Sequence, residues 1–195
     1  MSMSDSIYRH IIAITNRLLS RRPFDVQIER ICRLHPQALI LREKDLSGEA
    51  YQTLAEKVLA ICAGYNVPCI LHQFTQAAQN LGVRKIHLPL RQLEEEHVKL
   101  KSGAFELVGV SVHSVEDALR AQKAGASYVT AGHIFATDCK AGLPPRGTDF
   151  LKEVCSAVQI PVYAIGGIRP EEKQIEKVLS CGAAGACIMS GMMEC

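Results

Sequence analysis

Residues 107–131, LVGVSVHSVEDALRAQKAGASYVTA, contain one complete strand–helix–strand unit. Leu107–Ser111 is an apolar run of strand length, and Tyr128–Ala131 is a second. Between them, Ser114-Val115-Glu116-Asp117 has the pattern of a capping box that begins a helix, and Gly125 stands where a helix would have its C-terminal glycine. The stretch therefore predicts two strands joined by a helix, a connection typical of parallel sheets.

The same alternation runs through the rest of the chain. Strand-length apolar runs are found at Ile11–Thr15, Ala38–Arg42, Pro68–Leu71, Lys85–Leu88, Pro161–Ile165 and Ala186–Met189. Helical patterns follow at 23–34, 47–65, 75–81, 90–100, 149–158 and 170–181, with Ser47 and Gly182 as expected caps. Continuous apolar strands are typical of a parallel sheet that is covered on both faces.

Eight strands alternating with helices favour a (β/α)8 TIM barrel, and an open doubly wound sheet is the alternative. The eighth helix is truncated, because only Ser190–Cys195 follows the last strand. We expect a single domain over residues 1–195, with residues 1–7 as a flexible tail. The short end either leaves the barrel partly open or is covered by a partner subunit, and the second case predicts a homodimer.

Composition narrows the function classes. The chain has 195 residues, of which 48% are hydrophobic, and a formal charge of +2, which gives no reason to expect nucleic acid as a partner. No apolar run is long enough to span a membrane, and no signal-peptide pattern opens the sequence. The eight cysteines form no CxxC motif, so we expect free thiols and a cytoplasmic protein.

In such a barrel, functional residues gather at the carboxyl ends of the strands. His133 directly follows a strand and is a candidate acid and base near neutral pH. The other residues at these ends are Arg42, Lys44, His72, Gln73, His87, Ser111, His113, Gly166, Gly167, Ser190 and Gly191. The position of these polar groups predicts an active site at this face.

Several of these residues have a purely structural alternative. The pairs Gly166-Gly167 and Ser190-Gly191 are either a phosphate-binding site or simply turn residues. Arg42 and Lys44 either bind an anion or lie in a solvated loop, where Glu43 and Asp45 compensate their charge.

The histidines leave a similar choice. His87 and His113 are either site residues or satisfied, partly buried side chains. A zinc site built from several histidines is conceivable, but the donor set favours no metal and no cofactor.

A long connection joins the strand at Tyr128–Ala131 to the helix that begins near Asp149. Its roughly fifteen residues include His133, Asp138, Cys139, Lys140 and Arg146, and connections of this length are usually functional or disordered. Cys139 is either a nucleophile or part of the pocket wall, and we favour the wall because seven other cysteines have no evident role.

Five segments carry a family resemblance. They resemble the thiamine phosphate synthase superfamily of (β/α)8 barrels, in order and over most of the chain, and they are LREKDL (41–46), GVSVHS (109–114), ASYV (126–129), IPVYAIGGI (160–168) and MSG (189–191). Within that superfamily the segment GHIFATDCK (132–140) is similar to the loop of the TenI-type thiazole tautomerase branch.

The resemblance implies an isomerase of thiamine biosynthesis that needs no metal or cofactor. Its substrate would be the carboxythiazole phosphate tautomer made by thiazole synthase, and its product the aromatic carboxythiazole phosphate. By the resemblance, His133 moves the proton, and Arg42, Lys44, Ser111, His113, Lys140, Gly167, Ser190 and Gly191 bind the substrate.

The synthase branch is the alternative, because it joins a pyrimidine diphosphate to a thiazole phosphate with Mg²⁺. Its pattern has Gln at position 40, Asn-Asp at 72–73 and a second metal-binding Asp near 92, where this chain has Ile40, His72-Gln73 and Gln92. Mg²⁺ prefers carboxylate oxygens, so the missing carboxylates favour the tautomerase. A non-catalytic regulatory protein that binds the ligand is a third alternative.

Overall fold

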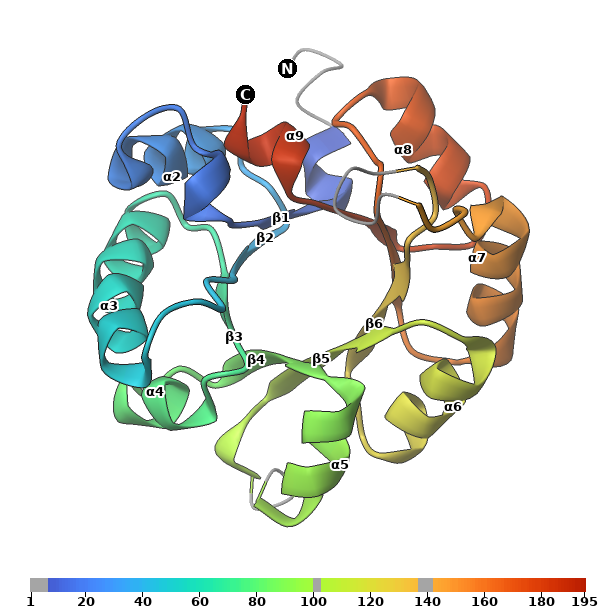
Figure 1. Cartoon of the computed structure of the whole chain (residues 1–195), viewed down its shortest axis with the longest axis horizontal. Coiled ribbons are helices and arrows are strands. Elements are labelled where there is room, and N and C mark those ends of the chain that lie inside the picture. Colours follow the sequence, from blue (N-terminus) through green and yellow to red (C-terminus); the bar gives the residue numbers. More distant parts are fainter. Residues whose placement is uncertain (1–6, 100–102, 137–141) are drawn as a thin grey trace.

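The computed structural model describes residues 7–99, 103–136 and 142–195 and has the expected barrel (Figure 1). Eight parallel strands close into one sheet in sequence order, with β8 paired to β1 through Ile11 and Ala186. The strands are β1 (Ile11–Ile14), β2 (Ala38–Leu41), β3 (Cys69–His72), β4 (Lys85–Pro89), β5 (Leu107–Val112), β6 (Tyr128–Gly132), β7 (Val162–Ile165) and β8 (Gly185–Ile188). The (β/α)8 prediction is confirmed, and the open-sheet alternative is wrong because the sheet has no free edge.

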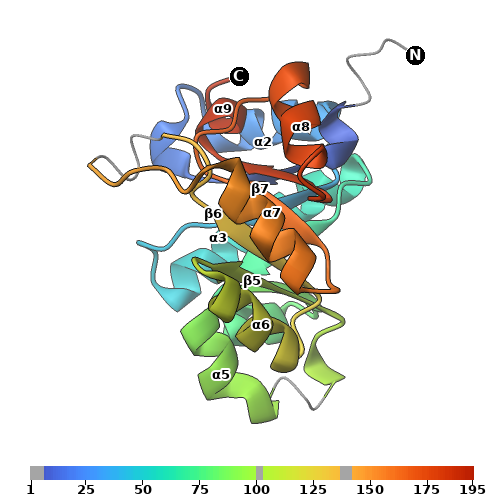
Figure 2. The same ribbon diagram turned by 90° about the vertical axis from the view of Figure 1, so that its right-hand side faces the viewer.

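Helices cover the outside of the barrel, and in Figure 2 α5, α6 and α7 follow one another along one side. The α-helices are α2 (Phe24–Arg33), α3 (Gly48–Gly64), α4 (Thr75–Asn80), α5 (Leu90–Lys99), α6 (Val115–Lys123), α7 (Gly147–Ala157), α8 (Glu172–Leu179) and α9 (Ser190–Met193). Two short 3-10 helices, η1 (Tyr8–His10) and η2 (Arg17–Leu19), flank β1 and were not predicted. Among the described residues, no helix is long and apolar enough to cross a membrane.

The predicted caps form as expected. The hydroxyl of Ser47 accepts from the Ala50 amide, and that of Ser114 accepts from the Asp117 amide at 3.0 Å. Gly125 and Gly182 have φ values of +93° and +88°, the left-handed conformation of a helix C-terminal glycine. Local chemistry therefore fixes these helix ends.

Alternate strand residues face two separate apolar regions. Ile11 and Ala13 pack under the helices, whereas Ile12 and Ile14 pack with residues of five other strands in the barrel interior. Because one strand face meets helices and the other meets strands, both faces are largely buried and most strand residues are apolar. The interior also holds Tyr128, Tyr163 and Cys187.

The truncated eighth helix is confirmed, because α9 has one turn. Its Met192 and Met193 are fully buried. The buried Gln27 of α2 donates to the Met192 carbonyl at 2.8 Å, and Arg22 donates to the Cys195 carbonyl at 2.6 Å. The chain's own α2 therefore contacts this end.

The homodimer stays a prediction for sedimentation to test. The tail expected over residues 1–7 lies outside the described residues except for Ile7.

Candidate functional site

A cavity of about 750 Å³ opens at the carboxyl ends of the strands. Seven of the residues predicted for substrate or catalysis line it, namely Arg42, Lys44, Ser111, His113, His133, Gly167 and Ser190. Gly191 is not among its lining residues, and Lys140 lies outside the described residues together with Asp138 and Cys139. The structure thus brings most of the predicted set to one cavity, while the role of each residue stays a prediction.

His133 lies directly after β6 and is only 6% exposed. Its Nε2 atom is 3.4 Å from the carbonyl oxygen of Leu143, and its Nδ1 atom is buried with no hydrogen-bond partner among the described residues. The Arg146 amide donates to the His133 carbonyl at 3.0 Å. The far end of the long connection therefore folds back onto His133.

Gly166 and Gly167 follow β7 and lie against the backbone that carries His133. They have φ values of +101° and +68°, and the Phe135 amide donates to the Gly166 carbonyl at 3.0 Å. A Cβ atom on Gly166 would lie 2.4 Å from the His133 Cβ, and one on Gly167 would lie 2.3 Å from the Ala136 carbonyl oxygen. The close approach of this backbone to the segment that carries His133 is enough to require glycine at both positions. Phosphate binding by Gly167 and Ser190 therefore stays a prediction.

His87 is a satisfied histidine inside the barrel. Its Nδ1 lies 3.0 Å from the Tyr128 hydroxyl and its Nε2 lies 2.9 Å from the Ser111 hydroxyl, which also accepts from Thr130 at 3.4 Å. Burial, and then the charge of Lys44, lower the pKa of His87 to about 3, so its imidazole is neutral. His87 is therefore better interpreted as a satisfied buried side chain than as a residue that binds substrate.

His72 lies beside His87, and the two rings stack at 5.7 Å between centroids. Its side chain lines the cavity and its Nδ1 has no partner among the residues that the structure describes. Burial, followed by the neighbouring His87, Lys44 and Arg42, lowers the pKa of His72 to about 2. The wall therefore carries a second neutral imidazole, for which the sequence suggested no role.

His113 differs from both, because it is exposed at the cavity edge. Its Nδ1 lies 3.2 Å from the carbonyl oxygen of Gly132, the residue before His133. Since a carbonyl only accepts, this contact places a proton on Nδ1. His113 thereby contacts the segment that carries His133.

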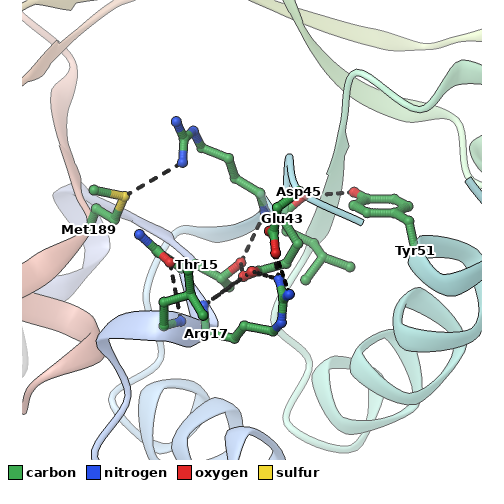
Figure 3. Close-up of polar contacts among 10 residues, drawn as sticks. Thr15, Arg17, Glu43, Asp45, Tyr51 and Met189 are labelled. Atoms are coloured by element: carbon green, nitrogen blue, oxygen red, sulfur yellow. Dashed lines mark hydrogen bonds and ion pairs between the residues drawn. The ribbon is translucent and has the colours of Figure 1, made fainter. Parts of the chain in front are cut away.

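Arg42 and Lys44 both face the cavity. The Arg42 Nη1 atom lies 4.0 Å from the Met189 sulfur, and partial burial followed by the Arg42 charge lowers the pKa of Lys44. Glu43 and Asp45 do not compensate these two cations, because both carboxylates pair with Arg17 (Figure 3). The two carboxylates thus do not pair directly with Arg42 or Lys44, and anion binding by these cations stays a prediction.

The residues at the positions of the synthase metal ligands do not fit a bound Mg²⁺. Among the described residues, no group of three His, Cys, Asp or Glu side chains could hold a metal ion. Gln73 and Gln92 stand where the synthase pattern has carboxylates, and the Gln92 side-chain amide donates to the Gln73 carbonyl at 2.8 Å. Neutral amides are poor ligands for a hard cation beside a diphosphate.

Sequence reasoning missed the rim formed by α5 and α6. Glu94 of α5 accepts two hydrogen bonds from Arg120 of α6, at 3.0 and 2.7 Å, and Asp117 lies 3.5 Å from the same guanidinium. These three residues and Arg91 line the outer part of the cavity. In the sequence these four residues are only charged positions of two predicted helices. No pattern within either helix indicates that the two helices meet at a cavity wall.

The chain is similar to proteins of one family. A family model described as thiamine monophosphate synthase (TMP-TENI) matches residues 11–192. "Thiamine-phosphate synthase 2" of Streptococcus pneumoniae is 32% identical over 182 residues, which cover 93% of this chain and 86% of the relative. "Thiamine-phosphate synthase" of Enterococcus faecalis is 32% identical over 184 residues, which cover 94% and 86%.

A solved structure gives the same result. Thiamine phosphate pyrophosphorylase from Pyrococcus furiosus superposes with a TM-score of 0.81 at 25% identity, covering 96% of this chain and 88% of that chain. These names agree with the superfamily resemblance. For the reaction, they back the transferase alternative better than the isomerase, and they do not distinguish the tautomerase branch.

Proposed function

The chain belongs to the thiamine monophosphate synthase family, and on that premise we propose that it isomerises a carboxythiazole phosphate tautomer to the aromatic carboxythiazole phosphate by proton transfer through His133. The observation that carries this proposal is the set of side chains in the cavity. A nearly buried imidazole lines the same cavity as two cations that have no carboxylate partner among the described residues, and the positions of the synthase carboxylates hold the neutral amides Gln73 and Gln92.

Aromatisation moves one proton from ring C2 to the exocyclic carbon. One imidazole near its neutral pKa can accept the first proton and deliver it in turn. The Leu143 carbonyl oxygen 3.4 Å from Nε2 only accepts, so a neutral His133 carries its proton on Nε2 and has Nδ1, which has no partner among the described residues, as the nitrogen that accepts a proton. Arg42 and Lys44 would hold an anionic end of the substrate, and Ser111 and His113 would line its ring.

The transferase is the second candidate, and the names of the relatives favour it. It would join a pyrimidine diphosphate to a thiazole phosphate, with Mg²⁺ neutralising the diphosphate. The residues at the positions of the synthase metal ligands do not fit that ion, so no step of the proposed mechanism passes through a metal.

Two assays on the purified protein separate the candidates. We expect the thiazole tautomer to aromatise faster than its spontaneous background, equally well with and without EDTA, and we expect no thiamine phosphate from the two synthase substrates with Mg²⁺. Formation of thiamine phosphate would instead establish the transferase. Binding of the thiazole phosphate with neither reaction would indicate a regulatory protein.

The His133→Ala variant tests the residue itself. We expect it to lose the acceleration and to keep its affinity for the aromatic product, because the imidazole moves a proton rather than supplying charge. His10→Ala is the matched control, because His10 lies in η1 before β1, at the opposite end of the strand. Full turnover by His133→Ala would overturn the assignment.

A further inference from the structure

Glu43 is a buried carboxylate in an otherwise exposed charged segment. It is only 2% exposed, although the two residues that follow it, Lys44 and Asp45, are exposed. It accepts from the Thr15 hydroxyl at 2.7 Å, from the Arg17 amide at 3.0 and 3.1 Å, and from the Arg17 guanidinium at 3.0 Å. A buried carboxylate with this many donors is fully paired.

The partners of Glu43 come from the segment that follows β1. Arg17 also forms a two-point ion pair with Asp45, so one guanidinium joins two carboxylates of the segment after β2 (Figure 3). Asp45, first, and then Glu43 hold the pKa of Arg17 above its ordinary value. The segments after β1 and β2 are therefore joined by charge-assisted hydrogen bonds.

Thr15 extends this network to the backbone of Arg42. Its hydroxyl donates to Glu43 and accepts from the Arg42 amide at 3.0 Å. Because side chains alternate along extended backbone, Arg42 lies on the side opposite to Glu43, and Lys44 follows in the turn that begins at Glu43. Both line the cavity, and neither has a carboxylate partner among the described residues.

We propose that Glu43 is a positioning residue, which acts through Thr15 and Arg17 to hold Arg42 and Lys44 in the cavity as an unpaired cationic pair for an anionic ligand. This proposal shares one assumption with the proposed function, namely that Arg42 and Lys44 bind the anionic group of the ligand. Both Glu43 and Asp45 pair with Arg17, so neither carboxylate pairs with Arg42 or Lys44.

Inorganic pyrophosphate is the probe, because its binding does not depend on which reaction the protein performs. We expect Glu43→Gln to weaken pyrophosphate binding, measured by calorimetry, roughly tenfold, the scale of one charge-assisted hydrogen bond. Asp45→Asn is the matched control: it removes the other, exposed carboxylate of Arg17 and leaves Thr15, Glu43 and Arg42 joined. We expect its affinity to stay within about twofold of the parent.

A mutant cycle separates positioning from general loss of fold. In an Arg42→Met/Lys44→Met background, we expect Glu43→Gln to have no further effect on pyrophosphate affinity, because its effect passes through the removed cations. An equal loss in both backgrounds, parent-like binding by Glu43→Gln, or no pyrophosphate binding by the parent protein would each overturn the proposal.

Two further measurements complete the test. If Glu43→Gln does not fold, Thr15→Val takes its place. Valine removes the acceptor for the Arg42 amide and leaves the Glu43–Arg17 pair intact. Weaker pyrophosphate binding by Thr15→Val supports the proposal, and unchanged binding overturns it. In the tautomerase assay, we expect Glu43→Gln to raise KM with kcat unchanged. Absence of tautomerase activity in the parent would count against the proposed function alone.

Discussion

A single methyl group on Gly166 should move His133 out of place. Gly166→Ala puts a Cβ atom 2.4 Å from the His133 Cβ and 2.8 Å from its Cα, whereas ordinary contacts begin at 3.4 Å. Relief of the closer contact requires a displacement of about 1 Å, a shift that costs roughly 100-fold in rate when it misplaces a catalytic group. The alanine also has to adopt a φ of +101°, which costs about 1–2 kcal/mol.

The control separates the two costs. Gly125→Ala imposes a similar conformation, φ +93°, but its Cβ would have no neighbour within 4 Å. We expect both variants to lose stability in urea denaturation, Gly166→Ala more than Gly125→Ala because of the added steric contact, and Gly166→Ala alone to lose about 100-fold in tautomerase kcat. Equal kcat values for the two variants would refute the argument that this glycine fixes the position of His133.

Two predictions concern stability. Tyr51→Phe removes a buried hydroxyl that donates to the Leu41 carbonyl at 2.7 Å and accepts from the His72 amide at 2.9 Å. We expect this substitution to lower the free energy of unfolding by roughly 2–4 kcal/mol in denaturant titrations. Tyr65→Phe, at the surface, is the control, and an equal loss of unfolding free energy in both variants would contradict this reasoning. The pKa values of about 2 and about 3 for His72 and His87 lie below the unfolded value of about 6.5, so the unfolded chain binds more protons as pH falls. Stability should therefore fall from about pH 6.5 to pH 4, by about 1.4 kcal/mol per pH unit for each histidine, and a flat profile would count against neutral buried imidazoles.

The sequence was sufficient for the barrel because the information is local and repeated. Most strand residues are apolar on both faces of the sheet, and each predicted cap uses groups within a few residues, as at Ser114 and Gly125. Strand ends then predicted the cavity, since a parallel barrel brings all of them to one face.

The site's fine structure depends on partners that are distant in sequence. The sequence offers Glu43 only as a compensating charge for Arg42 and Lys44 in one of two alternatives, because Thr15 and Arg17, which bury it, follow another strand. His72 and His87 look alike in sequence, and only the hydroxyls of neighbouring strands make one satisfied and leave the other without a partner for Nδ1. The choice between isomerase and transferase depends on such details, so the family names alone do not decide it.

The pairing of β1 with β8 has a consequence during synthesis. Ile11–Ile14 leaves the ribosome first and is buried at all four positions in the finished barrel, yet the strand that pairs with its second edge is made last. Until β8 emerges, the nascent chain carries an apolar strand with an open hydrogen-bonding edge, the kind of surface on which chains aggregate. Synthesis of β8 is therefore the step that covers the second edge of β1 and closes the barrel.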